Sequence, residues 1–506
     1  MNRSADRFTF HPEPPASPGI ARSLARLLAL VPLLVPLLGS AAGCATNPVT
    51  GKPQLALMTV QQEIEMGRQT HQEVLQTMGA YQDQDLQRYV EETGQRLAQA
   101  SERPDLPWAF TVIDDPSVNA FALPGGFIYL TRGILSHMAS EAEMVSVLGH
   151  EIGHVTARHS VERISKAQLA QVGLIAGMIL SPELRNFGDL ASTGLQVMFL
   201  KFSRDDERQA DDLGFRYMNQ AGYEPREMVE MFHVLDRVSR VPGQGRLPNW
   251  LATHPNPEDR LQRIQQQIAA ATPEVLGSTV DRRDFLQRID GVVFGEDPRE
   301  GYFRGSSFYH PQMGFTVRFP EGWRTSNQKQ AVGAISPRED AVIVLTLARG
   351  DSPEEAARRF FGQQGVRQGN AWRGEIGGLP SVSSSFQVSQ AQGGDIVGLA
   401  AFVEHTGRVF QLLGYTVQGR ARAYEGPIEG SLATFSRLTD RRYLDVQPKR
   451  IDLVRIDRDM PLEEFNRRYP STVDLPTLAI INHVDAGDTL RSGQEYKRVV
   501  GGELPP

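Results

Sequence analysis

Two histidines and a glutamate stand close together in the sequence His150-Glu151-Ile152-Gly153-His154. On a helix, residues four positions apart share a face, so both imidazoles can bind one metal ion. Imidazole nitrogens at this spacing suit Zn²⁺, and the glutamate lies where a carboxylate can take a proton from water. The pattern therefore predicts a zinc site with Glu151 as general base. The alternative is a solvated surface helix without a ligand.

The residues around this motif predict the helix that it requires. Ser140 followed by Glu143 has the spacing of a capping box at a helix start. An apolar stripe then continues at helical spacing through Met144, Val145, Leu148, Ile152 and Val155. We expect this stripe to face the core. The metal site would then lie at the edge of the core, partly dry but open to a cleft.

A zinc peptidase needs a third protein ligand and an open fourth position. A second predicted helix begins after Ser203, carries acids in its first turn and ends near Gly222. Glu207 and Asp211 lie one turn apart on it and share a face. Glu207 could bind the metal, and Asp211 could orient a ligand histidine. The alternative is an ordinary solvated helix start.

A predicted strand pair precedes the zinc motif. The segments 119–123 and 127–131 flank Pro124-Gly125-Gly126, which predicts a turn. An edge strand beside the zinc helix could bind an extended peptide through main-chain hydrogen bonds. The candidate substrate-binding residues are Asn119, Ala120, Phe121 and Ala122. The alternative is a plain core hairpin.

These motifs together resemble the HtpX-like gluzincin metallopeptidases (peptidase family M48), which include the CAAX prenyl proteases. The resemblance rests on the segments 119–126, 150–154, 203–211 and 253–260 and extends from Pro48 to Ala271. It implies a mostly α-helical zincin domain with a small β-sheet, in a bacterial lipoprotein branch of the family. It also implies one Zn²⁺ per chain and a zinc metalloendopeptidase activity.

The resemblance assigns roles to individual residues. It implies that His150, His154 and Glu207 bind zinc, that Glu151 is the general base, and that Asp211 supports a ligand.

His254 lies in a proline-rich turn, where a histidine is more often structural than catalytic. The resemblance places this turn near the metal. There His254 could stabilise the oxyanion, or occupy the fourth zinc position and keep the enzyme idle. Arg260 could anchor the loop or contribute positive charge. His159 is close enough in sequence to contact a ligand.

The N-terminus predicts a signal peptide at 1–43. Arginines precede an apolar run at 27–38 that is too short and too proline-broken to span a membrane well. Small residues then lead to Cys44 and resemble a lipobox, which implies acyl chains on Cys44 and a membrane anchor. Ala45 after it indicates sorting to the outer membrane, on the periplasmic side. The alternative is ordinary cleavage with Cys44 a free thiol. A single cysteine allows no internal disulfide.

The length predicts several domains. We expect a zinc metallopeptidase domain at 44–275, a linker at 276–304, an α+β domain at 305–442 and a small unit at 450–506. The strand and turn before Trp323, with a final hairpin and helix, resemble a PsbP/Mog1-type sandwich, which we interpret as a binding or scaffold domain. The β-α-α-β order of the last unit resembles a LysM module, which implies contact with peptidoglycan.

The apolar segment Leu169 to Leu180 is too short to cross a bilayer. With the next apolar run, at 190–202, it is predicted to form core helices. A lid over the cleft and a membrane contact are the alternatives.

The net charge of the chain bears on the class of molecule that the protein binds. The chain carries −7, and the predicted signal peptide holds four arginines and two acids, so its removal leaves −9. This argues against nucleic-acid binding. Two functions remain. One is a zinc endopeptidase that hydrolyses misfolded or stalled envelope proteins. The other is a non-proteolytic or weakly proteolytic assembly factor for outer-membrane proteins. The partners in both are unfolded or misassembled envelope proteins.

Overall fold

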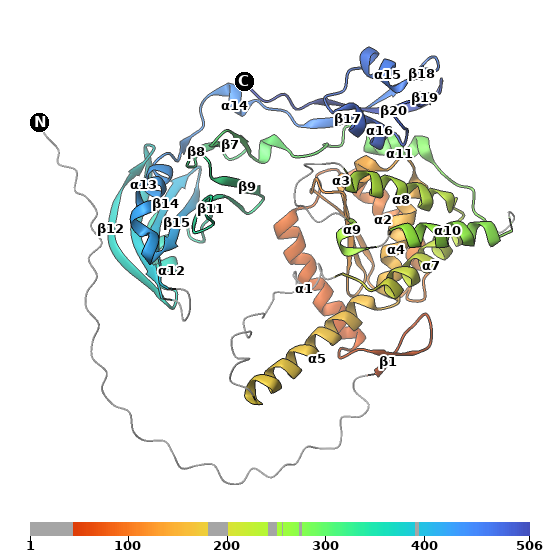
Figure 1. Cartoon of the computed structure of the whole chain (residues 1–506), viewed down its shortest axis with the longest axis horizontal. Coiled ribbons are helices and arrows are strands. Elements are labelled where there is room, and N and C mark those ends of the chain that lie inside the picture. The colour runs from red at the N-terminus through yellow and green to blue at the C-terminus, as the bar shows by residue number, and fades with distance from the viewer. Residues whose placement is uncertain are drawn as a thin grey trace, which may run out of the picture. The chain divides into compact units, whose positions relative to one another are not determined.

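The computed structural model describes residues 44–180, 201–240, 250–255, 257–272, 276–389 and 394–505. The predicted signal peptide and the part of the second apolar run before Lys201 lie outside the described residues. The described chain has three parts: a first domain (44–293), a sheet domain (302–437) and a C-terminal unit (449–501). Each has a main core, and Ile480 of the C-terminal unit packs into the core of the first domain. Figure 1 shows their elements.

The first domain is mainly helical. Its helices are α1 (Val60–Met78), α2 (Gln84–Gln99), α3 (Arg132–His137), α4 (Glu141–Thr156), α5 (His159–Leu180), α7 (Arg204–Gln220), α8 (Arg226–Ser239), α9 (Trp250–Thr253), α10 (Pro257–Ala270) and α11 (Arg282–Ile289). Strands β1 (Cys44–Thr46) and β2 (Pro53–Leu55) pair with each other. A small sheet has the order β3-β5-β4, from β3 (Ala109–Ile113), β4 (Ala120–Leu123) and β5 (Phe127–Thr131).

Helix α4 carries the His-Glu-x-x-His motif and is buried along its whole length. Its predicted N-cap is confirmed, because the Ser140 side chain accepts the backbone N–H of Glu143 at 3.1 Å. The Glu143 carboxylate accepts from Ala139 N at 2.7 Å, one residue outside the predicted capping box. The helix contacts α2, α7, α8 and β4. It therefore lies inside the domain with neighbours on several sides.

Glycines allow α4 and α7 to approach closely. A Cβ added to Gly214 would lie 2.9 Å from the backbone nitrogen of His150. One added to Gly153 would lie 2.9 Å from the carbonyl oxygen of Ala210. Both distances are below ordinary contact, so larger residues would push the helices apart. This approach brings side chains of α7 to the histidines of α4.

The predicted linker contains a packed helix. In α11, Phe285, Leu286 and Ile289 are buried in the core of the first domain. These three residues share one face of a short helix. The charged residues around them interrupt the apolar pattern, so the sequence did not predict this helix. Within the described residues, no helix is long and apolar enough to cross a membrane, α5 included.

The sheet domain has two antiparallel sheets, with orders β12-β13-β14-β15-β11-β10-β9 and β16-β8-β7-β6. Its elements are β6 (Tyr302–Arg304), β7 (Ser307–His310), β8 (Phe315–Arg318), β9 (Arg324–Gln328), β10 (Ala331–Ile335), β11 (Ala341–Leu347), α12 (Pro353–Phe361), β12 (Val366–Ile376), β13 (Leu379–Val388), β14 (Ile396–His405), β15 (Arg408–Val417), α13 (Ala421–Leu432) and β16 (Ser436–Arg437). The expected final hairpin and helix are present, with the hairpin turn at Thr406-Gly407 and the helix as α13.

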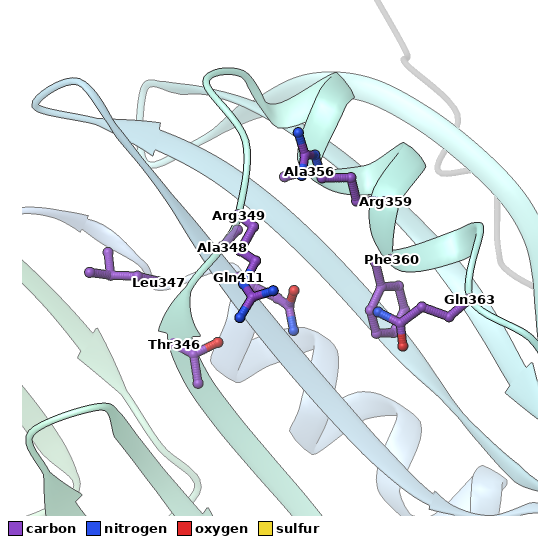
Figure 2. A pocket seen from close by; sticks show the side chains of 9 residues that line it. All are labelled: Thr346, Leu347, Ala348, Arg349, Ala356, Arg359, Phe360, Gln363 and Gln411. Carbon is purple, nitrogen blue, oxygen red and sulfur yellow. The ribbon is translucent and has the colours of Figure 1, made fainter. Parts of the chain in front are cut away.

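The alternating side chains of β14 show that α12 and α13 lie on opposite faces of the larger sheet. Ala401 and Val403 belong to the core that includes α13, whereas Ala400 and Phe402 pack with α12. Side chains of successive strand residues point to opposite faces, which gives a helix–sheet–helix arrangement in this part. A hollow of about 390 Å³ lies between α12 and the end of β11 (Figure 2).

The C-terminal unit has the predicted β-α-α-β order. Its elements are β17 (Lys449–Arg455), β18 (Met460–Pro461), α15 (Leu462–Arg468), α16 (Leu475–Ile481), β19 (Thr489–Leu490) and β20 (Glu495–Gly501), with β17 and β20 antiparallel. The unit contacts the loop before α4. The ammonium of Lys497 donates to the carbonyl oxygens of Ser136 and Met138 at 3.0 and 2.7 Å. His483 pairs with Glu143 at 3.0 Å.

Candidate metal centre and active site

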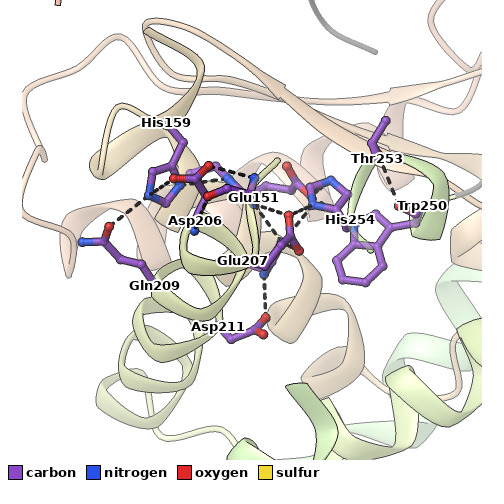
Figure 3. Close-up of polar contacts among 12 residues, drawn as sticks. Glu151, His159, Asp206, Glu207, Gln209, Asp211, Trp250, Thr253 and His254 are labelled. Atoms are coloured by element: carbon purple, nitrogen blue, oxygen red, sulfur yellow. Dashed lines mark hydrogen bonds and ion pairs between the residues drawn. The ribbon is translucent and has the colours of Figure 1, made fainter. Parts of the chain in front are cut away.

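Four side chains from three places in the chain meet at one point. His150 and His154 come from α4, Glu207 comes from α7, and His254 directly follows α9. One ligand atom from each lies within 4.8 Å of all the others. The structure thus brings together the three ligands expected from the resemblance and adds His254 as a fourth (Figure 3).

The separations between these atoms suit a tetrahedral zinc ion. His150 Nε2 lies 3.0 Å from His154 Nε2 and 3.2 Å from His254 Nδ1. Glu207 Oε1 lies 3.0 Å from His254 Nδ1 and 3.6 Å from His154 Nε2. Zinc–ligand bonds of about 2.0–2.1 Å in a tetrahedron place the ligand atoms about 3.3 Å apart. The observed separations bracket that value.

The donor set also suits zinc chemically. Imidazole nitrogens and a carboxylate are typical zinc ligands. Glu207 Oε2 is buried without a hydrogen bond, although it forms an ion pair with Arg260 Nη1 at 2.6 Å. The ion pair engages Oε2 and leaves Oε1 of the same carboxylate beside the histidine nitrogens, 3.0 Å from His254 Nδ1. Burial raises the pKa of Glu207, but His254 and Arg260 together lower it below its ordinary value, which favours the carboxylate.

Asp211 and Arg260 contact two of the ligand residues, His150 and Glu207. Asp211 Oδ1 lies 2.9 Å from His150 Nδ1, which leaves Nε2 of that ring for the metal. Arg260 donates to both oxygens of Asp211 at 2.6 Å. Burial raises the pKa of Asp211, but Arg260 outweighs that effect, and the pKa falls to about 2. The expected roles of Asp211 as a support and of Arg260 as an anchor are both consistent with these contacts.

His159 supports the second ligand. Its Nδ1 lies 3.0 Å from His154 Nδ1, and its Nε2 lies 3.0 Å from Gln209 Oε1. The two contacts fit a relay in which His154 donates from Nδ1 and keeps Nε2 for the metal. Burial, followed by the neighbouring His150, lowers the pKa of His154 well below its ordinary value. The imidazole is therefore neutral, as a metal ligand must be.

The general-base candidate has a partner that the sequence did not indicate. Trp250 Nε1 donates to Glu151 Oε1 at 3.1 Å, and His254 Nε2 lies 3.5 Å from the same oxygen (Figure 3). The indole ring also stacks on the His254 ring, with centroids 4.6 Å apart. No sequence motif marks Trp250. Its position four residues before His254 was the one available signal.

The site is closed in this structure, which corrects the expectation of an open cleft. His150, Glu151, His154 and His254 are each 1% exposed. The physical reason is α9, which places Trp250 and His254 over the motif, together with Phe202, whose ring centroid lies 3.9 Å from that of His154.

The candidate substrate strand lies at an edge of the small sheet. The order β3-β5-β4 leaves one side of β4 without a partner strand in that sheet. Ala120 is buried and Phe121 is 9% exposed, and β4 contacts α4. Asn119 just before the strand has a buried Oδ1 without a hydrogen-bond partner among the described residues.

Comparison with known proteins identifies the first domain. Residues 84–268 match the model of peptidase family M48. A putative β-barrel assembly-enhancing protease of Vibrio cholerae is 28% identical over 257 residues, which cover 48% of this chain and 53% of the relative. The mitochondrial metalloendopeptidase OMA1 of Schizosaccharomyces pombe is 32% identical over 44% of this chain and 66% of the relative.

The chain spans about half the length of the β-barrel assembly-enhancing proteases that it matches. A solved PsbP from Synechocystis covers 27% of this chain and 94% of its own, with 15% identity and a TM-score of 0.23, which is too low to support an argument.

The family match includes the motif helix, the Glu207 helix and the His254 turn, and the four ligand atoms converge as one zinc ion requires. Residues 84–268 therefore form a zinc metallopeptidase domain of peptidase family M48.

Proposed function

We propose that this protein is a zinc endopeptidase that hydrolyses misfolded or stalled proteins of the bacterial envelope. The observation that carries the proposal is the convergence of His150, His154 and Glu207 within ligand distance, with Glu151 beside them. The names of the bacterial relatives, β-barrel assembly-enhancing proteases, support the choice of envelope proteins as substrates.

Each residue of the site has its own role in the proposed hydrolysis. His150, His154 and Glu207 would hold the zinc ion, which would supply Lewis-acid chemistry for attack on a peptide carbonyl. Glu151 takes the proton of the attacking water and passes it to the leaving amine. Asp211 and His159 fix the rings of the two ligand histidines. Because the attacking group is water, no covalent acyl-enzyme is expected.

The free edge of β4 is the proposed substrate strand. A substrate added there in extended form would bond to the main chain of Asn119, Ala120, Phe121 and Ala122 beside α4. The orphaned oxygen of Asn119 supports this role, because a buried acceptor without a donor is costly unless a ligand supplies one. Main-chain binding tolerates many sequences and suits unfolded clients.

His254 is proposed to hold the site in an idle state. Its Nδ1 lies 3.2 Å from His150 Nε2 and 3.0 Å from Glu207 Oε1, where it would occupy the fourth zinc position. Arg260 anchors the turn, with Nη1 3.4 Å from the His254 carbonyl oxygen. Cleavage then requires the His254 ring to leave. The alternative role of His254 is to stabilise the oxyanion.

The closed site also favours the second function, an assembly factor that binds clients and rarely cuts them. A protease assay separates the two. Wild type and Glu151→Gln are incubated with unfolded casein, with and without a zinc chelator. The peptidase proposal expects cleavage by wild type alone and its loss with the chelator. Absence of cleavage by zinc-loaded wild type would favour the assembly factor.

The protein is proposed to be an outer-membrane lipoprotein that faces the periplasm. The lipobox-like sequence before Cys44 supports this location. Cells labelled with palmitate should incorporate label into wild type but not into Cys44→Ser. Equal labelling of both proteins, or none in either, would contradict lipidation at this residue.

The two C-terminal parts are proposed to bind partners. The PsbP/Mog1-like sheet domain offers the hollow of Figure 2, which is lined by Arg349 and by Arg359, the latter paired with Glu355 at 2.7 Å. The β-α-α-β order supports a LysM-like role for the C-terminal unit. Peptidoglycan sacculi should then pull down the full chain. A chain that stays in solution would exclude this role.

A further inference from the structure

We propose that Trp250 is a positioning residue for the general base, acting through the hydrogen bond from its indole N–H to the Glu151 carboxylate. The inference rests on the proposed peptidase function and adds to it a residue outside the metal ligands. It concerns where the proton of the attacking water goes.

The bond has an ordinary hydrogen-bond length and is protected from solvent. Trp250 is 2% exposed and Glu151 is 1% exposed. Nε1 and Oε1 lie 3.1 Å apart, and the two side chains approach each other from α9 and α4 (Figure 3). A hydrogen bond to a carboxylate is stronger in such a dry place than at the surface.

The indole ring is itself held in place. The backbone nitrogen of Trp250 donates to the carbonyl oxygen of Val118 at 3.1 Å, at the loop that leads to β4. The Arg260 guanidinium lies 4.7 Å from the centroid of the indole ring, and the Phe232 ring lies 5.9 Å away. The donor therefore has a fixed position from which it can orient a carboxylate.

The backbone anchors leave room for the His254 ring to move alone. Trp250 is held through Val118, and the His254 carbonyl is held through Arg260. The imidazole stacks on the indole, but its rotation about the side-chain bonds would leave both backbone anchors in place. The Trp250–Glu151 bond can thus persist in the open site.

The chemistry of the indole fits a positioning role. Indole N–H donates a hydrogen bond but has no acceptor lone pair and does not ionise near neutral pH. It cannot take the proton from water in place of Glu151. Its bond engages Oε1 and leaves Oε2 of the same carboxylate to receive that proton. The base is then fixed in one orientation before substrate arrives, which is how positioned groups lower a barrier.

Trp250→Phe is the test variant, because phenylalanine keeps a ring and removes the N–H. Trp108→Phe is the matched control. Trp108 is 6% exposed, and its indole donates at 3.0 Å to the carbonyl oxygen of Arg103, away from the ligands. Both variants lose one buried indole hydrogen bond, so a general loss of packing would affect them alike.

Cleavage of unfolded casein by the full-length zinc-loaded chain gives the first readout. We expect Trp250→Phe to lower kcat roughly tenfold to a hundredfold, as the loss of a charged hydrogen bond allows. KM and zinc content should stay near wild type. Trp108→Phe should keep kcat. An unchanged kcat in Trp250→Phe overturns the inference, and so does an equal fall in both variants.

Nuclear magnetic resonance of indole N–H groups gives a readout that needs no cleavage. The chain has four tryptophans, and the Trp250 signal is the one that disappears in Trp250→Phe. It should shift in Glu151→Ala, whereas the Trp108 signal stays. A Trp250 signal that does not move contradicts the bond. If zinc-loaded wild type cleaves nothing, the proposed function is wrong. The positioning role of Trp250 in that function is then wrong too, even if the Trp250 signal shifts in Glu151→Ala.

Discussion

Asp211 holds the ring of His150 through a contact of 2.9 Å between Oδ1 and Nδ1. The same carboxylate receives both Nε and Nη2 of Arg260. Arg260 therefore fixes the Asp211 carboxylate, and this carboxylate in turn fixes the ring of the zinc ligand His150. Partners of this kind fix the tautomer of a ligand histidine and strengthen metal binding.

Asp211→Asn should weaken zinc binding about tenfold to a hundredfold, because an amide is a weaker acceptor from His150 and loses the ion pair with Arg260. Zinc affinity is measured by competition with a chromogenic chelator. Asp212→Asn is the control, since Asp212 is partly exposed and pairs with Arg263 instead. Equal affinities for wild type and Asp211→Asn would contradict the support role.

Gly214→Ala should separate α4 from α7. The added methyl would lie 2.9 Å from the backbone nitrogen of His150, which cannot yield as a flexible side chain would. We expect a loss of about 1–3 kcal/mol in unfolding free energy and weaker zinc binding, because Glu207 moves with α7. Gly430→Ala is the control, as its Cβ would meet nothing within 4 Å. Wild-type zinc affinity in Gly214→Ala would show that the close approach is not needed.

His254→Ala should raise the rate of casein cleavage several-fold while the protein keeps zinc. The variant empties the fourth position and leaves His150, His154 and Glu207 in place. His233→Ala, which alters an exposed histidine on α8, should have the wild-type rate. A lower rate in His254→Ala would support the oxyanion role. Unchanged rate and unchanged zinc-site geometry would exclude both roles.

Lys497 should make the stability of the protein depend on pH. Burial lowers its pKa to about 7, whereas a lysine in an unfolded chain has a pKa of about 10.4. Between these values the unfolded state binds more protons, so stability rises with pH by up to about 1.4 kcal/mol per unit. Below pH 7 both states are protonated and the dependence ends.

Lys497→Met isolates this effect. Thermal unfolding of wild type and variant is compared at pH 7.5 and pH 9. Wild type should gain about 2 kcal/mol relative to Lys497→Met over that range. Lys52→Met, at an exposed lysine, should show no such change relative to wild type. A wild-type advantage that falls as pH rises would contradict the burial of an uncharged amine at 497.

The local patterns in the sequence predicted much of the first domain. Ser140 and Ser203 cap the helices expected to begin there, and the strand pair around Gly125 is present. Such features depend on residues close in sequence, whose spacing is visible. The resemblance to known motifs then joined Glu207 to the histidines, which spacing alone could not do.

The unpredicted features depend on contacts between distant residues. Trp250 carries no motif, and its bond to Glu151 exists only because α9 folds back onto α4. The approach of Gly149 to Gly214 likewise appears only when two helices pack. Strands β12 and β13 were not predicted. Most of β12 is exposed and polar, without the apolar alternation of a half-buried strand.

The metal content of the full-length protein, purified without chelators, tests the account most directly. Wild type and Glu151→Gln should each contain one zinc per chain, and Glu207→Gln should contain far less, because Glu207 is a ligand and Glu151 is not. A folded wild type without stoichiometric zinc, or a Glu207→Gln variant that binds zinc as wild type does, would contradict the proposed centre.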